Sequence, residues 1–240
     1  SYRPVDATFV GIHEYDDNTP NLSRRGRDAC AADMGSLLRS LRDMPVEPLT
    51  DSETIDKKLA EGFLEIQLWE HGSQHFYESN PSLYVSEAVF GILSLLRREF
   101  APFKQRLENA VQRLNSVPIL LEQCVENVQK APRAWTLKAI RECTGAIFLL
   151  DEGLKLLTTQ ESVDCKHVSE ASERAVTAFK SLNHYLETNL IHRGRDNYGC
   201  GEEGFDLLMR KGHFISMDAE EIQAYAQEQF VESEHNLKKY

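Results

Sequence analysis

Two histidines, His71 and His75, have the four-residue spacing at which zinc proteases present two metal ligands on one helical turn. In those enzymes a glutamate follows the first histidine, because its carboxylate must reach the metal-bound water as a general base. Here Gly72 follows His71, and glycine weakens the helix that would hold the two imidazoles rigid. We therefore interpret the pair as ordinary histidines and expect no metal ligands in this chain.

A second polar group precedes Pro20. His13 and Glu14 form a His-Glu dipeptide, but Asp17 stands where a zinc motif needs its second imidazole. Asp16 and Asp17 are residues that favour a turn, because their side chains bond to nearby backbone amides. The composition of this segment predicts a structural turn.

The stretch 192–201 reads His-Arg-Gly-Arg-Asp-Asn-Tyr-Gly-Cys-Gly and is the main irregular segment between predicted helices. It places the thiol of Cys200 just before a helix start, where free amides favour the thiolate, so a Cys nucleophile with a nearby histidine as base is one hypothesis. No orienting third group is evident. Arg195 and Tyr198 are candidates for donating to a peptide carboxylate or carbonyl in a substrate cleft.

Apolar residues recur at helical spacing along nearly the whole chain, and no segment alternates at period two for more than about four residues. The sequence therefore predicts an all-α protein, a bundle-like array of about eight helices, two of them long, after an irregular N-terminal segment. We expect a single helical domain over residues 1–240. The predicted helices cover residues 23–44, 50–79, 84–100, 102–129, 132–157, 164–190, 202–211 and 217–240.

Several residues mark the helix ends. Ser23 is a predicted N-cap, and Thr50 with Glu53 fits a capping box. Pro118 is expected to kink or split its helix, and Gly212 is placed for a left-handed C-cap. The helix after Thr50 carries a predicted apolar side that consists of Ile55, Leu59, Phe63, Ile66 and Trp69.

Composition excludes some classes of partner. A formal net charge of -11 repels phosphate backbones, and the densest basic cluster, residues 24–27, is interpreted as a solvated helical turn, so no nucleic acid is expected. No apolar run approaches the ~18 residues that span a bilayer, which predicts no membrane contact. Five scattered cysteines, an odd number, indicate reduced thiols. We expect a cytoplasmic protein, although a cleaved signal peptide would leave the same sequence.

The motifs in their order resemble a known family. They are Ala-Thr-Phe-Val-Gly-Ile-His-Glu-Tyr-Asp-Asp at 7–17, Asn-Pro-Ser-Leu-Tyr-Val at 80–85, Gly-Glu-Glu-Gly-Phe at 201–205 and Leu-Leu-Met-Arg at 207–210, with Arg-Leu at 106–107 and 113–114. Over nearly its whole length the chain resembles domain of unknown function family 885.

The resemblance implies that members of this family are zinc-dependent peptidases of the thermolysin-related kind. They are about twice as long as this chain and carry a His-Glu-x-x-x-x-His-His metal motif in their C-terminal half. That motif is absent here. The chain then corresponds to the helical N-terminal half, one wall of the cleft, while zinc is expected in the missing half. His13, Tyr15 and Asp16 lie in a matching stretch and are further cleft candidates.

The first hypothesis is therefore the helical N-terminal portion of a metal-dependent peptidase-like hydrolase, inactive alone, with no cofactor of its own. Its partners would be the C-terminal half of the same protein or a second copy, with a peptide substrate, and an apolar face should stay open where the missing half docks. The native chain would then extend past Tyr240. The alternative is a complete, non-catalytic helical module that binds a protein or peptide partner in a groove between helices.

Overall fold

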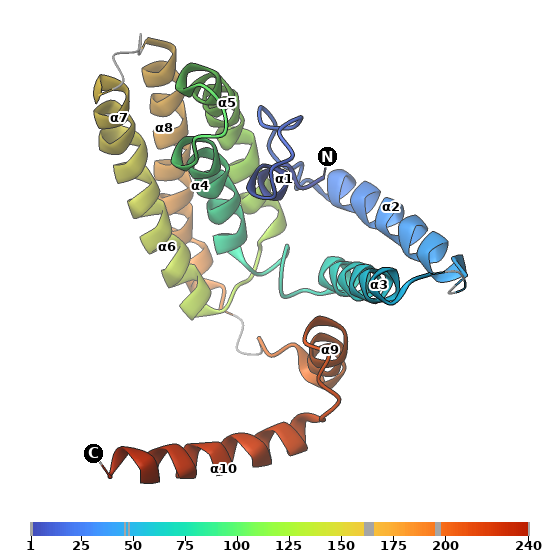
Figure 1. Ribbon diagram of the computed structural model, residues 1–240. Helices are drawn as coiled ribbons and strands as arrows, with labels where there is room; N and C mark the ends of the chain where they lie inside the picture. The colour runs from blue at the N-terminus through green and yellow to red at the C-terminus, as the bar shows by residue number, and fades with distance from the viewer. Residues whose placement is uncertain (1, 46, 48, 161–165, 195–197, 240) are drawn as a thin grey trace. The chain divides into compact units, whose positions relative to one another are not determined.

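The computed structural model describes residues 2–45, 47, 49–160, 166–194 and 198–239, and the regular elements among these residues are helices, with no strand (Figure 1). The predicted all-α fold is confirmed. The helices are α1 (Pro4–Phe9), α2 (Arg24–Asp43), α3 (Asp51–Gly72), α4 (Pro81–Arg97), α5 (Phe103–Asn127), α6 (Arg133–Phe148), α7 (Leu154–Gln160), α8 (Lys166–Thr188), α9 (Gly201–Leu207) and α10 (Ala219–Leu237). Short π-helical segments, Leu149–Gly153 and Leu208–Gly212, follow α6 and α9.

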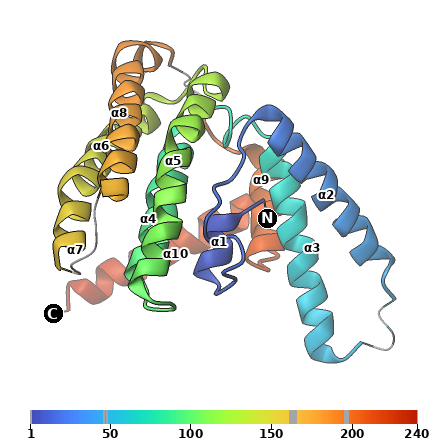
Figure 2. The same ribbon diagram turned by 90° about the horizontal axis from the view of Figure 1, so that it is seen from above.

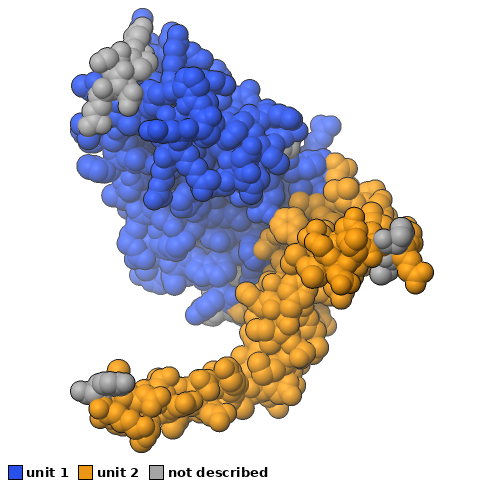
Figure 3. Space-filling model, viewed as in Figure 1, with its two compact units in different colours: residues 1–30, 73–198 blue, residues 31–72, 199–240 orange. Residues whose placement is uncertain are grey.

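The chain divides into two compact units (Figure 3). The first consists of residues 1–30 and 73–198, and the second of residues 31–72 and 199–240. Two compact units can belong to one folding domain, so the single domain expected from the sequence stays a prediction.

Four of the helices in the first unit, α4, α5, α6 and α8, form its core. α4 packs against α5 and α6, and α8 packs against the same two helices, so the four enclose one core (Figure 1 and Figure 2). The apolar stripes predicted at helical spacing face inward, which removes them from water and drives the packing. Among the fully buried side chains are Tyr84, Ile92, Leu95, Leu114, Leu120, Phe179, Leu182 and Leu186.

Pro118 lies inside α5, which continues through it from Phe103 to Asn127. The helix is therefore not split there, contrary to one of the two outcomes expected from the sequence. Proline has no amide hydrogen, so the carbonyl of Leu114 loses its usual helical donor. The burial of Leu114 and Val117 in the core stabilises the helix across this break in the hydrogen-bond ladder.

In the second unit α3 packs against the π-helical segment Leu208–Gly212. A Cβ added to Gly62 would lie 2.6 Å from the carbonyl oxygen of Lys211, so this close approach requires glycine. Beside it, Glu65 accepts hydrogen bonds from Arg42 at 2.7 Å and from Lys211 at 3.3 Å. Burial alone would raise the pKa of the Glu65 carboxyl, but these two cations outweigh it and hold that pKa below its ordinary value.

The predicted caps are largely confirmed. The hydroxyl of Ser23 accepts a hydrogen bond from the Gly26 amide at 3.2 Å. Thr50 and Glu53 form the expected capping box, since the Thr50 amide donates to the Glu53 carboxylate at 2.8 Å and the Glu53 amide donates to the Thr50 hydroxyl at 3.3 Å. The left-handed cap expected at Gly212 is wrong. The left-handed residue of that turn is Phe214, with φ of 56°.

Two helices of the second unit expose apolar side chains. On α3, the predicted apolar side is open at Ile55, Leu59 and Phe63, which are 58%, 48% and 49% exposed. On α10, the exposed apolar side chains are Tyr225, Phe230, Val231 and Leu237. The apolar side of α3 predicted from the sequence therefore exists, but these three residues contribute little to the core.

Candidate functional site

The segment that follows α1 brings two of the predicted cleft residues together. The carboxylate of Asp16 lies 3.0 Å from Nδ1 of His13. The imidazole of His13 also stacks on the ring of Phe100, with centroids 3.8 Å apart and planes 11° from parallel. A carboxylate on Nδ1 favours the tautomer with its proton there and leaves Nε2 as an acceptor. Asp16 is only 2% exposed, whereas the His13 side chain is 36% exposed. The pair therefore presents an oriented imidazole at the surface.

A buried polar network fixes this pair. The second carboxylate oxygen of Asp16 accepts a hydrogen bond of 2.6 Å from the Thr8 hydroxyl. That hydroxyl in turn accepts one of 2.8 Å from Nη2 of Arg113, whose side chain is buried in α5. The network thus runs from a charged group in the helical core, through α1, to the exposed imidazole of His13.

Arg113 also holds the backbone around the network. Its guanidinium donates to the carbonyls of Pro4, Tyr15 and Gly91 and to the hydroxyl of Ser94, at 2.6–3.3 Å. Burial lowers the pKa of Arg113 to about 10, while the nearby Asp16 carboxylate opposes that shift. The guanidinium therefore stays protonated at neutral pH and supplies a permanent positive charge behind the site.

A second, partly buried carboxyl lies close to this network. Burial, and after it the negative charge of Asp6, raise the pKa of Glu87, on α4, to about 7. Arg3 and Arg113 act in the opposite direction. Glu87 therefore changes its charge near neutral pH, next to the helix that carries Thr8.

A hollow of about 600 Å³ adjoins the third predicted cleft residue, Tyr15. Arg25 contributes an exposed guanidinium from the first turn of α2, and no ion pair of Arg25 is found within the described part of the chain. A guanidinium with tyrosine hydroxyls nearby can bind a carboxylate or a peptide carbonyl. The hollow is lined by Tyr2, Tyr15, Asn18, Thr19, Asn21, Arg25, Gly26 and Ala29.

Local packing positions Arg25. A Cβ on the neighbouring Gly26 would lie 2.4 Å from the backbone oxygen of Asn21, so only glycine permits this turn. The Asn21 side chain accepts hydrogen bonds from the Ser23 amide at 3.1 Å and the Ser23 hydroxyl at 2.7 Å. These contacts fix the start of α2, from which Arg25 extends to the hollow.

The other two cleft candidates are not joined to this group. Arg195 lies outside the described residues. Tyr198 is 57% exposed, and its ring lies 6.1 Å from that of Trp135 on α6, at an interplanar angle of 58°. No described contact connects Tyr198 with His13, Tyr15 or Asp16.

The histidines at 71 and 75 do not share a helix face. α3 ends at Gly72, and His75 lies in the following turn, so the four-residue spacing no longer places the two imidazoles one above the other. Within the described residues no group of three or more His, Cys, Asp or Glu side chains converges to hold a metal ion. The residues that the structure describes thus do not fit a zinc site.

Sequence reasoning missed four residues of the site: Thr8, Arg25, Phe100 and Arg113. A signal for Arg113 exists, because it falls within the buried stripe of α5, where an arginine must find several acceptors.

The basic cluster at 24–27 was predicted to be solvated, and this is wrong for Arg27. That side chain is 7% exposed and its guanidinium lies 5.1 Å from the centroid of the Tyr77 ring.

The chain is similar to a described protein family and to a solved structure. A model of the family described as bacterial protein of unknown function, DUF885, matches residues 4–240. No curated protein matches the sequence. A solved structure from Shewanella oneidensis, described as a candidate lipoprotein of unknown function, is similar with a TM-score of 0.81 and 20% identity. The similarity covers 97% of this chain and 43% of the solved chain, so this chain spans less than half of that protein.

None of the described helices is both long and apolar enough to cross a bilayer. The cytoplasmic location expected from the sequence stays a prediction.

Proposed function

This chain belongs to the DUF885 family of bacterial proteins, and from that membership we propose that it is the helical N-terminal portion of a longer metal-dependent peptidase-like hydrolase. In this account it forms one wall of the substrate cleft. The observation that carries the proposal is the hollow beside Tyr15, which an exposed guanidinium and two tyrosines line. Tyr15 follows the oriented imidazole of His13 by two residues in the chain.

The length comparison supports a longer protein. The solved structure with the same fold extends well beyond the region it shares with this chain. The apolar side chains left open on α3 and on α10 offer surfaces that further polypeptide would cover. Exposed apolar side chains such as Phe63 and Phe230 are removed from water when another segment packs on them, and this burial is favourable.

The metal in this proposal comes from the remainder of the protein. Because the described residues do not fit a zinc site, we assign no catalytic step to a metal held by this chain. The contribution of the chain is binding and orientation. Arg25 would bind a substrate carboxylate, and Nε2 of His13 would accept a hydrogen bond from a peptide amide or a hydroxyl.

The test uses the full-length protein that contains this chain, assayed with a peptide that has a free C-terminal carboxylate and with its amidated counterpart. For Arg25→Gln we expect KM for the free acid to rise about tenfold, with kcat nearly unchanged, because the lost contact binds ground state and transition state equally. The amidated peptide should be hydrolysed equally by both proteins. Arg24→Gln is the matched control, since Arg24 precedes Arg25 but does not line the hollow.

Two results would overturn the proposal. A full-length protein that hydrolyses no peptide would remove the hydrolase assignment. An Arg25→Gln variant that hydrolyses both peptides as the unmodified protein does would remove the hollow from the cleft.

A further inference from the structure

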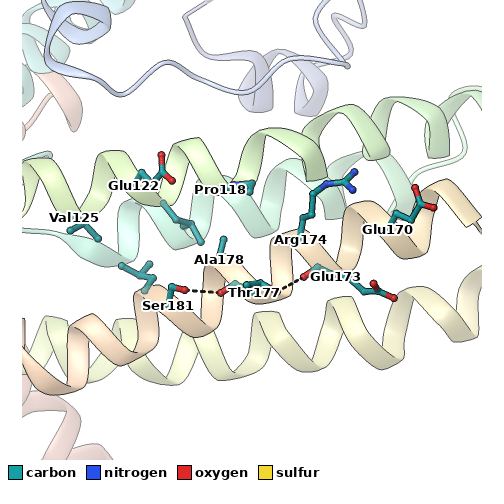
Figure 4. Close-up of a pocket in the computed structure, with 11 residues that line it drawn as sticks. Pro118, Glu122, Val125, Glu170, Glu173, Arg174, Thr177, Ala178 and Ser181 are labelled. Carbon is teal, nitrogen blue, oxygen red and sulfur yellow. Dashed lines mark hydrogen bonds between the residues drawn. The ribbon is translucent and has the colours of Figure 1, made fainter.

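A groove of about 650 Å³ runs between α5 and α8 in the first unit (Figure 4). Its apolar lining consists of Pro118, Val125 and Ala178, which are partly exposed, and of Leu121 and Leu182, which are each only 2% exposed. Pro118 and Ala178 carry short side chains that leave room between the two helices. No residue of this groove lines the hollow at Tyr15.

The two helices run in the same direction. Near the start of the groove Arg174 on α8 donates a 2.7 Å hydrogen bond to the side chain of Asn115 on α5. Further along both helices, the Tyr185 hydroxyl donates to the Val128 carbonyl at 3.4 Å. At 1.5 Å per residue, the lining segment 170–182 of α8 extends over about 18 Å, or about three helical turns. Its length therefore matches a short helix laid along it.

The rim of the groove is acidic. Glu122 lies on the α5 side, and Glu170 and Glu173 lie on the α8 side. Arg174 is the basic residue of the lining, and its guanidinium is engaged with Asn115. Throughout the described ranges neither Glu122 nor Glu170 takes part in an ion pair. The rim is negative, as is the whole chain, whose formal net charge is -11. A negative rim attracts cationic segments.

We propose that this groove binds an amphipathic helix of a partner protein, whose apolar stripe is flanked by lysines or arginines. The apolar lining takes the stripe, and the carboxylates of the rim pair with the flanking cations. The two features together fix the chemistry of the occupant, because an acidic helix would be repelled and a purely apolar ligand would leave the rim without a partner. This partner site does not depend on the proposed hydrolase.

The test measures fluorescence anisotropy of a labelled synthetic 18-residue peptide with the 240-residue chain. The probe has leucines on one helical stripe and lysines on both sides of it. Comparison peptides carry glutamate in place of every lysine, or the same residues in an order that disperses the stripe. Decanoate serves as a small apolar competitor.

We expect the striped lysine peptide to bind more tightly than either comparison peptide, and increasingly weakly as salt is added. Glu122→Gln with Glu170→Gln should weaken this binding about fivefold, because two exposed ion pairs are lost. Ala178→Phe should weaken it at least about tenfold by filling the groove. The double variant Glu108→Gln with Glu228→Gln is the charge-matched control, and it should bind as the unmodified chain does.

Equal binding of the dispersed or glutamate peptide would overturn the proposal, as would unchanged affinity in the Glu122→Gln, Glu170→Gln variant. Displacement of the peptide by decanoate with no dependence on the glutamates would assign the groove to small apolar molecules instead. Circular dichroism of each variant excludes unfolding as the cause of lost binding. If Ala178→Phe does not fold, the glutamine variants still decide the question.

Discussion

The guanidinium of Arg113 donates a 2.8 Å hydrogen bond to the hydroxyl of Thr8, a residue 105 positions earlier in the chain. Both side chains are buried, at 1% and 3% exposure. This contact joins the N-terminal segment to the helical core, and it places the His13–Asp16 pair at the end of a network that begins inside α5. The candidate site is therefore built on the core and not on a free loop.

Arg113→Lys should lower the free energy of unfolding by about 2 kcal/mol, since a single ammonium cannot reach acceptors on α1, α4 and the Tyr15 backbone at once. Urea denaturation measures this change. Arg141→Lys, at an exposed position on α6, is the control and should change stability by less than about 0.5 kcal/mol. Equal stability of the two variants would contradict the anchoring role of Arg113.

Thr8→Val should cost about 2 kcal/mol, because the buried Asp16 carboxylate and the Arg113 guanidinium each lose a partner while the side-chain volume stays the same. Thr144→Val is matched to it, since the exposed Thr144 hydroxyl bonds only to the Ile140 carbonyl of its own helix. In a double-mutant cycle, Thr8→Val and Arg113→Lys should together cost less than the sum of their separate effects. Strict additivity would show that the two residues act independently.

Glu87→Gln tests the partly buried carboxyl of α4. The folded pKa is about 7 against 4.5 for an exposed glutamate, so the folded protein binds the extra proton between these values and this group's contribution to stability falls as pH rises through that window. The variant should therefore be more stable than the unmodified chain at pH 8, on the order of 1–2 kcal/mol, and nearly equal at pH 4.5.

Thermal unfolding at both pH values measures this difference. Glu108→Gln, at an exposed position of α5, should show no such pH-dependent gain. A Glu87→Gln variant that is less stable at pH 8 would mean that the charged carboxylate is needed in the fold.

Gly62→Ala should destabilise the second unit by about 2 kcal/mol or more, because the new methyl group would lie 2.6 Å from the backbone oxygen of Lys211. Gly35→Ala in α2 is the control. Its nearest neighbour would be a flexible arginine nitrogen at 3.6 Å, so the substitution should stabilise the helix by about 0.5–1 kcal/mol. The rate of hydrogen exchange of the α3 amides measures the loss of stability in the second unit. Faster exchange of these amides in Gly35→Ala than in Gly62→Ala would contradict the close packing of Gly62 against Lys211.

The helices could be predicted from the sequence because apolar spacing and caps are local signals, as Thr50 with Glu53 illustrates. Whether an apolar stripe is buried is not local, and this is why the stripe with Ile55 and Phe63 was predicted correctly as a pattern but lies exposed. The residues of the candidate site likewise divide into those joined by local sequence and those joined only by the packing of distant segments. His13 and Asp16 are neighbours in sequence, whereas Thr8, Phe100 and Arg113 join them only through packing over long separations.

The turn at Phe214 shows a further limit of sequence reasoning. Glycine is the usual left-handed residue at a helix end, so Gly212 was the expected position. The π-helical segment Leu208–Gly212 includes Gly212 and moves the left-handed residue to Phe214. A π-helical turn depends on tertiary contacts, here with α3, and leaves no clear mark in sequence periodicity.

The central claim, that this chain is the metal-free wall of a longer metal-dependent hydrolase, is tested most directly by the zinc content of the endogenous protein. The protein would be purified from its source under protease inhibition and compared by elemental mass spectrometry with the 240-residue chain. The account predicts near-stoichiometric zinc in an endogenous protein of about twice the length, and almost none in the 240-residue chain. Stoichiometric zinc in the 240-residue chain, or an endogenous protein without zinc, would contradict it.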